Sequence, residues 1–177
     1  MTGPAYAALL ACHVASVVAG FGALVATGLF ARRMAVSPEP RADPSLRRYF
    51  REGTNWVSRA VLVVPVFGAL LLATGDRRAV GEPWPWIGLG AWLVAAVTAA
   101  RWCWPAEAGI QRWLARPDAA VGPDEQAESS QGVVRGSAAV AAGREQLRAD
   151  CSAAARGGAV VSICFVVALV VMVGQPR

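Results

Sequence analysis

The chain has 177 residues, of which 55% are hydrophobic and 16% are charged, and its formal net charge at pH 7 is +5. Such a composition is too apolar for an ordinary soluble domain. The positive charge does not predict a nucleic-acid partner, because the basic residues cluster in loops between apolar runs. All 17 basic residues are Arg, and together with abundant Ala, Gly and Val they favour a bacterial protein.

Four apolar runs are long enough to cross a bilayer, which requires about 20 residues. They cover residues 4–30, 56–74, 84–104 and 157–174. In lipid only a helix or a closed barrel satisfies the backbone, and these runs lack the alternation of barrel strands. The sequence therefore predicts an all-α fold, an integral membrane four-helix bundle that forms one domain over residues 1–177.

The first run contains 23 uncharged residues, Ala8–Phe30, and in it the only histidine of the chain, His13. No basic segment precedes the run, so we expect a retained helix and not a signal peptide. At 100° per residue its small side chains gather on one side, which predicts a helix-packing face. The residues of this face are Cys12, Ser16, Gly20, Ala23 and Thr27.

His13 lies on the same side, about 13 Å along the helix from Pro4. A polar imidazole at that depth is expected to face the bundle and not the lipid. One interpretation is a neutral histidine hydrogen-bonded to another helix, for instance to a hydroxyl or to a carbonyl freed by Pro65. The other is an axial haem ligand or a copper ligand, because neutral imidazole binds both metals.

The second helix follows a loop with six Arg residues and has Pro65 in its middle, with Gly68 one turn further on. Proline removes a backbone donor, so a kink is expected there. Arg59 lies one turn inside the helix, where its side chain is expected to reach back to the lipid headgroups. Trp56 is expected at the same membrane interface.

The third helix has a second stripe of small residues, Gly88, Ala91 and Ala95. Tryptophans are expected at both of its interfaces: Trp84, Trp86, Trp102 and Trp104. Beyond it, residues 106–116 have the spacing of a short amphipathic helix at the membrane surface, separated from the third helix by a break at Pro105.

A polar loop is predicted over residues 116–132, and the Ala-rich residues 137–156 favour a helix that extends the fourth span. Arg residues concentrate in residues 31–55 and 105–156, so both loops are predicted to be cytoplasmic and both termini outside. The expected location is the bacterial plasma membrane, with the lipid bilayer as the first partner.

The stretches "CHVASVVAGFG", "RRYFREGTNWVSRAVLVVPVFGALLL" and "VMVGQP" resemble a family of small bacterial integral membrane proteins of unknown function. The layout is also similar to the CopD-like copper-resistance membrane domain. It is similar as well to a haem-binding membrane protein linked to protoporphyrinogen oxidation, whose first-helix histidine binds haem. That last resemblance implies a haem ligand at His13 alone.

No enzyme motif is visible, so no catalytic residue and no metal site is predicted. Three functional interpretations remain. The first is a structural or accessory protein that packs with itself or with partner membrane proteins through small-residue helix faces. The second is a haem- or copper-binding redox protein that uses His13, and the third is a small transporter or channel subunit.

Overall fold

The computed structural model describes residues 3–75, 80–116 and 130–174, apart from the side chains of residues 130–139. This part of the chain is helical and contains no strand, which confirms the all-α class. The helices are α1 (Pro4–Val36), α2 (Pro44–Tyr49), α3 (Trp56–Arg59), α4 (Val64–Thr74), α5 (Pro83–Thr98), α6 (Trp104–Ala115) and α7 (Ser130–Val173). Two other helical turns connect them, the 3-10 turn η1 (Ala60–Leu62) and the π-helix η3 (Ala99–Cys103).

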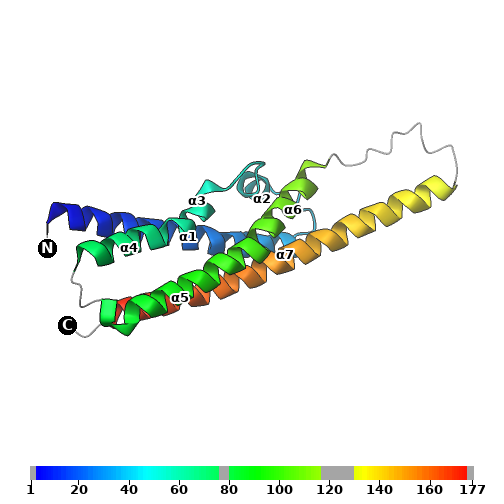
Figure 1. Ribbon diagram of the computed structural model, residues 1–177. Helices are drawn as coiled ribbons and strands as arrows, with labels where there is room; N and C mark the ends of the chain where they lie inside the picture. The colour runs from blue at the N-terminus through cyan, green and yellow to red at the C-terminus, as the bar shows by residue number, and fades with distance from the viewer. Residues whose placement is uncertain (1–2, 76–79, 117–129, 175–177) are drawn as a thin grey trace.

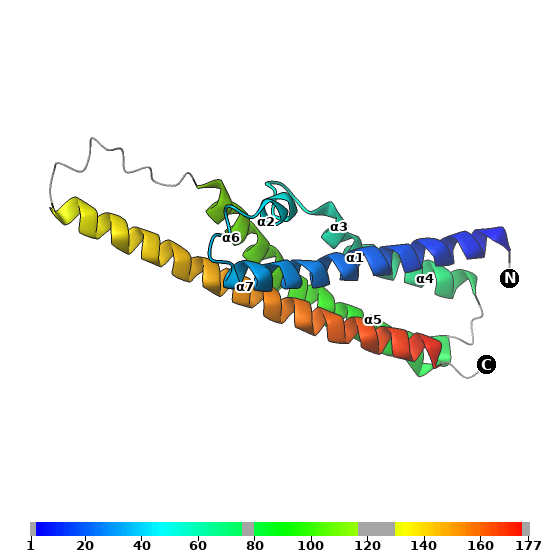
Figure 2. The same ribbon diagram turned by 180° about the vertical axis from the view of Figure 1, so that it is seen from behind.

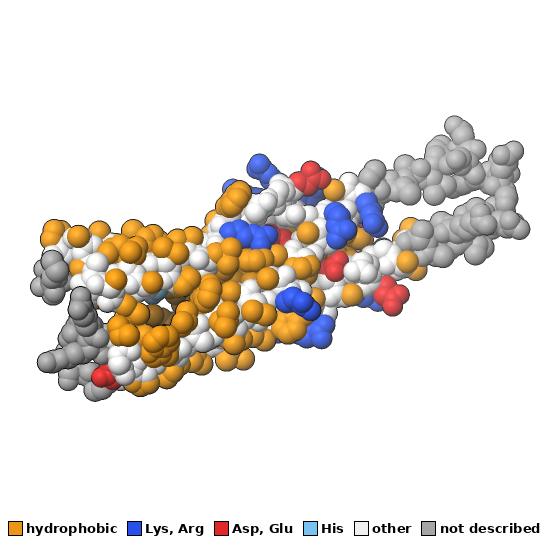
Figure 3. All heavy atoms as spheres, in the orientation of Figure 1, with side chains coloured by type: hydrophobic (Ala, Val, Ile, Leu, Met, Phe, Trp, Pro, Cys, Tyr) orange, Lys and Arg blue, Asp and Glu red, His pale blue; other side chains and the backbone are white. Residues whose placement is uncertain are grey.

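Four helical stretches are long and apolar enough to cross a membrane: Pro4–Val36, Trp56–Thr74, Pro83–Ala115 and Val140–Val173. They run lengthwise beside one another, and the start of α1 and the end of α7 lie at the same end of the bundle (Figures 1 and 2). Hydrophobic side chains cover that end, whereas charged side chains gather over the other half (Figure 3). This arrangement is compatible with a multi-pass membrane protein.

The buried residues form two separate clusters along the bundle. The apolar cluster lies between the spans and consists of Phe21, Leu24, Val61, Ala95, Ala99, Cys103, Val161 and Cys164. The polar-end cluster joins the end of α1 to α2, α6 and α7 and consists of Ala31, Met34, Leu46, Phe50, Ala106, Ile110, Leu147, Cys151 and Ala154. Much of the predicted cytoplasmic sequence is therefore packed into the bundle.

The second span changes its helical geometry just before Pro65. α3 ends at Arg59, η1 makes a 3-10 turn, and α4 starts with Pro65 in its first turn. In an uninterrupted helix the carbonyl of Val61 would accept a hydrogen bond from residue 65, which as a proline has no N–H. The indole Nε1 of Trp92 on α5 donates to this carbonyl instead, at 2.7 Å.

The third span continues through Pro105, so the break predicted there is wrong. α5 passes through η3 into α6, and the helical stretch extends from Pro83 to Ala115. The N–H of Trp104 bonds to the carbonyl of Ala99 five residues back, which is the wider π spacing. A wider turn leaves room for the proline ring without ending the helix.

α6 also packs more deeply than a helix at the membrane surface. Ala106, Glu107, Gly109 and Ile110 on this helix are buried, mainly against α7. The predicted amphipathic pattern is real, but its apolar side faces the protein.

α7 is one continuous helix of 44 residues, and the Ala-rich segment does extend the fourth span. Most of the polar loop predicted at 116–132 lies outside the described residues, and helix is already present at Ser130. In Figures 1 and 2 the first part of α7 projects beyond the other helices.

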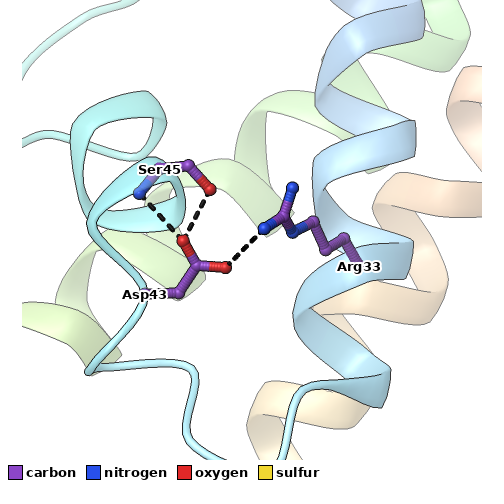
Figure 4. Close-up of polar contacts among 3 residues, drawn as sticks. All are labelled: Arg33, Asp43 and Ser45. Atoms are coloured by element: carbon purple, nitrogen blue, oxygen red, sulfur yellow. Dashed lines mark hydrogen bonds and ion pairs between the residues drawn. The ribbon is translucent and has the colours of Figure 1, made fainter.

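Asp43 fixes α2 against α1. Its carboxylate accepts hydrogen bonds from the backbone N–H of Ser45 at 2.9 Å and from the Ser45 hydroxyl at 2.6 Å, and so caps the helix. Arg33 of α1 approaches the other carboxylate oxygen at 3.0 Å (Figure 4). The short helix is thereby tied to the end of the first span.

Candidate functional site

His13 contacts the second span at the point where its helix restarts. Its side chain is buried, and Nδ1 lies 3.1 Å from the carbonyl oxygen of Val64. A carbonyl only accepts, so Nδ1 is the donor and the imidazole has its proton there. Nε2 then keeps its lone pair. The freed carbonyl of Val61 is not the partner, because Trp92 occupies it.

Gly68 lies beside the imidazole. A Cβ on Gly68 would lie 3.4 Å from Cε1 of His13. Pro65 and Gly68, which the sequence associates with a kink, therefore both border the position of the histidine.

The small residues predicted on the packing face of α1 have different surroundings. Gly20 packs directly on the η1 backbone, since a Cβ there would lie 2.7 Å from the Cα of Val61. Thr27 is buried, and its hydroxyl donates to the carbonyl of Ala23 at 2.9 Å. Ser16 is partly buried and donates to the carbonyl of His13, whereas Cys12 is exposed.

On α5 the small-residue stripe leads from the core into open space. Ala95 is fully buried in the apolar cluster and Ala91 packs against it. A Cβ on Gly88 would meet no atom within 4 Å. Only the end of the stripe at Ala91 and Ala95 therefore packs against other helices of the bundle.

The predicted interface residues lie mainly on the surface. Trp56, Trp86 and Trp102 are exposed, and Trp84 is partly buried. The Arg59 guanidinium lies over the ring of Trp104, 3.7 Å from its centroid, which is cation–π geometry. Arg59 thus has a partner within the protein.

The donor set for a metal is small. Among the described residues no three His, Cys, Asp or Glu side chains come together as a metal site. Cys103, Cys151 and Cys164 are buried free thiols. For a haem or copper ion at His13 the chain offers one neutral imidazole, which is a partial fit.

Glu107, which the sequence did not single out, is a buried acidic side chain with an unpartnered oxygen. It lies on α6 and is only 5% exposed, and its Oε1 has no hydrogen-bond partner among the described residues. An unsatisfied buried acceptor usually costs about 1–3 kcal/mol, so it calls for an explanation. In the sequence the only signal was a carboxylate one turn after Cys103, beside an aromatic run.

Glu107 lines a pocket of about 650 Å³ that opens to the surface. The pocket lies between α1, α2, the loop after α2, and α6. Besides Glu107, its walls include Phe30, Arg48, Tyr49, Arg51 and Gln111. A hydrophobic ring, two cations and two carboxylates therefore border the same space, the second carboxylate being that of the exposed Glu52.

Hydrogen bonds and ring packing hold these walls in place. Gln111 Nε2 donates to the carbonyls of Arg51 and Gly53 at 3.0 and 3.1 Å, which fastens the loop to α6. The Tyr49 ring stacks on Phe30 with centroids 4.1 Å apart, and its hydroxyl bonds to the first span. Burial raises the pKa of the Tyr49 hydroxyl, so it stays protonated near neutral pH.

Comparison with known proteins gives no relative: no family model, no curated protein and no solved structure matches the chain.

Proposed function

We propose that the chain is an accessory protein of the bacterial plasma membrane that binds a helical partner through the part of α7 projecting from the bundle. In this proposal residues 31–55 and 105–156 are cytoplasmic and both termini are outside. The partner is a second copy of the chain or another membrane protein.

The length of α7 supports this role. Its 44 residues correspond to about 66 Å of helix, whereas the hydrocarbon core is about 30 Å thick. Leu147 is the first buried residue along the described side chains of α7, and Val140 is 57% exposed. Helices in proteins gain most of their stability from tertiary packing, so a packing partner would stabilise the stretch before Leu147.

The small residues of the bundle also support a helical partner for α7. Gly20, Gly28 and Ala95 already pack against other helices of the chain. Gly143, in contrast, has open space where a Cβ would be. The face of α7 that contains it has room for the close approach of a helix.

The test is a photo-cross-linking residue placed at Val140, with Ile163 of the same helix as the matched control. Ile163 is 65% exposed in the apolar half, where lipid is the expected neighbour. We expect a protein adduct from position 140 and none from 163. An adduct of twice 18.5 kDa that contains two differently tagged copies identifies a homodimer. No protein adduct from position 140 in native membranes overturns the proposal.

A ligand role of His13 is the second candidate, favoured by the hydrogen bond of Nδ1. A histidine that donates from Nδ1 to a carbonyl has a fixed ring orientation and presents Nε2 as a lone-pair donor, the arrangement that metal-binding histidines use. The test is purification from cells supplied with haem and copper, compared with His13→Ala. A Soret band or bound copper that is lost on mutation supports the role, and neither in the parent protein refutes it.

A further inference from the structure

The pocket beside Glu107 contains a buried polar group without a partner among the described residues. One carboxylate oxygen is buried without a partner at its wall. The Arg33–Asp43 contact is the one salt bridge found among the described residues, so no described cation lies within ion-pair distance of Glu107. The charge of Arg59 acts on Glu107 from a greater distance. A ligand that donates a hydrogen bond to this oxygen would satisfy it, and a cationic donor would form the stronger bond.

The opposite charge is present at the same pocket. Arg48, near the end of α2, and Arg51, in the loop after it, also line the space, and both are exposed at its rim. Guanidinium groups match the geometry of phosphate oxygens. The pocket thus offers the buried Glu107 carboxylate at its wall, and two cations together with the exposed Glu52 at its opening.

The residues around the pocket are those expected near the depth of lipid headgroups. Phe30 of the first span forms part of the wall, and Trp56, which starts the second span, is exposed next to the wall residue Asn55. Hydrophobic side chains cover one half of the bundle, and charged side chains gather over the other (Figure 3).

We propose that this pocket binds a primary ammonium group linked to a phosphate, the chemistry of an ethanolamine phosphate headgroup. The ammonium donates to Oε1 of Glu107, and the phosphate meets Arg48 and Arg51. A primary ammonium has N–H donors for the unpartnered oxygen, whereas a quaternary ammonium has none. The same chemistry is present in an ethanolamine phospholipid and in free phosphoethanolamine.

The experiment is native mass spectrometry of the full chain, purified in detergent and offered equal amounts of two lipids with the same acyl chains. The pairs are phosphatidylethanolamine against phosphatidylglycerol and against phosphatidylcholine. One charge-assisted contact corresponds to about a tenfold preference for the ethanolamine lipid. Equal binding within both pairs overturns the proposal.

Glu107→Gln is the decisive variant, because it keeps the size of the side chain and removes its charge. We expect it to abolish the preference for the ethanolamine lipid, while Glu52→Gln at the exposed rim leaves most of it. Arg48→Gln combined with Arg51→Gln is expected to weaken all three phospholipids together. A preference that survives in Glu107→Gln refutes the assignment of the ammonium. If Glu107→Gln does not fold, the comparison of lipid pairs on the unaltered protein tests the proposal by itself.

Free phosphoethanolamine is then added as a competitor to distinguish the two sources. Displacement of the lipid at millimolar concentration supports the proposal and identifies the headgroup as the bound part. If the protein prefers the ethanolamine lipid but free phosphoethanolamine does not displace it, the proposal is supported and the ligand is the whole phospholipid.

Discussion

Gly28 of α1 and Gly158 of α7 meet backbone to backbone: a Cβ on Gly28 would lie 3.0 Å from the Cα of Gly158. The carbonyl oxygen of Ala154 would be 3.2 Å from the same Cβ. Backbone atoms cannot rotate away as a side chain can, so the two helices would have to separate.

Gly28→Ala should therefore destabilise the bundle by about 1–3 kcal/mol, the usual cost of overpacking. Gly22→Ala is the matched control, because a Cβ at Gly22 meets nothing within 4 Å on the same helix. Thermal unfolding in detergent measures both. If the two variants melt at the same temperature, the close contact between α1 and α7 is wrong.

Trp92→Phe should destabilise the protein by about 1–3 kcal/mol, because it leaves the buried carbonyl of Val61 without a donor. Trp86→Phe is the control, since its indole bonds to Val80 at an exposed position and its loss should cost less than about 0.5 kcal/mol. In a Pro65→Ala background residue 65 regains an N–H for this carbonyl. The loss of unfolding free energy caused by Trp92→Phe should then be smaller. If it is unchanged, Trp92 does not replace the donor that Pro65 lacks.

The single histidine allows its tautomer to be measured directly. Nitrogen-15 NMR of protein labelled at histidine should show a protonated Nδ1 and an unprotonated Nε2, as the bond to Val64 requires. Ser16→Ala removes a neighbouring hydroxyl that bonds to the carbonyl of His13 and should leave the tautomer unchanged. A proton on Nε2 alone would show that the bond to Val64 is absent.

Asp43 makes the attachment of α2 dependent on pH. The hydrogen bonds from Ser45 and the charge of Arg33 lower the pKa of this carboxyl in the folded protein. A lowered pKa stabilises the fold above the unfolded value, about 3.9, and this contribution is lost as the pH falls through the folded pKa. The protection of the α2 amides against hydrogen exchange, taken relative to the intrinsic rate at each pH, should therefore fall at acidic pH. Asp43→Ala should show fast exchange already at neutral pH, and Glu39→Gln should resemble the parent.

The orientation prediction rests on the Arg-rich loops and has a direct test. A reporter that is active only in the cytoplasm, fused after the last residue of the chain, should give no signal. The same reporter inserted in the 117–129 segment should be active. A strong signal from the C-terminal fusion would reverse the orientation.

The four spans could be predicted because length and hydrophobicity alone define a membrane helix. Pro105 was misread because a helix can accommodate a proline through a π turn, which depends on the turn before it and leaves no local signature. Glu107 was missed because its burial comes from α6 packing against distant parts of the chain, and a polar residue just beyond an apolar run usually faces water. His13 was expected to face the bundle, but its partner, the carbonyl of Val64, is a backbone atom that no sequence pattern marks.

The two clusters of buried residues imply that the chain melts in two stages. The polar-end cluster, with Leu46, Phe50 and Ile110, is stabilised by the exclusion of water and should respond to urea. The apolar cluster gains little from that effect in lipid and depends on close packing and interhelical hydrogen bonds. Urea should therefore release α2 and loosen the packing around Ile110 of α6, while the apolar cluster remains assembled. A single unfolding free energy would then not describe the molecule.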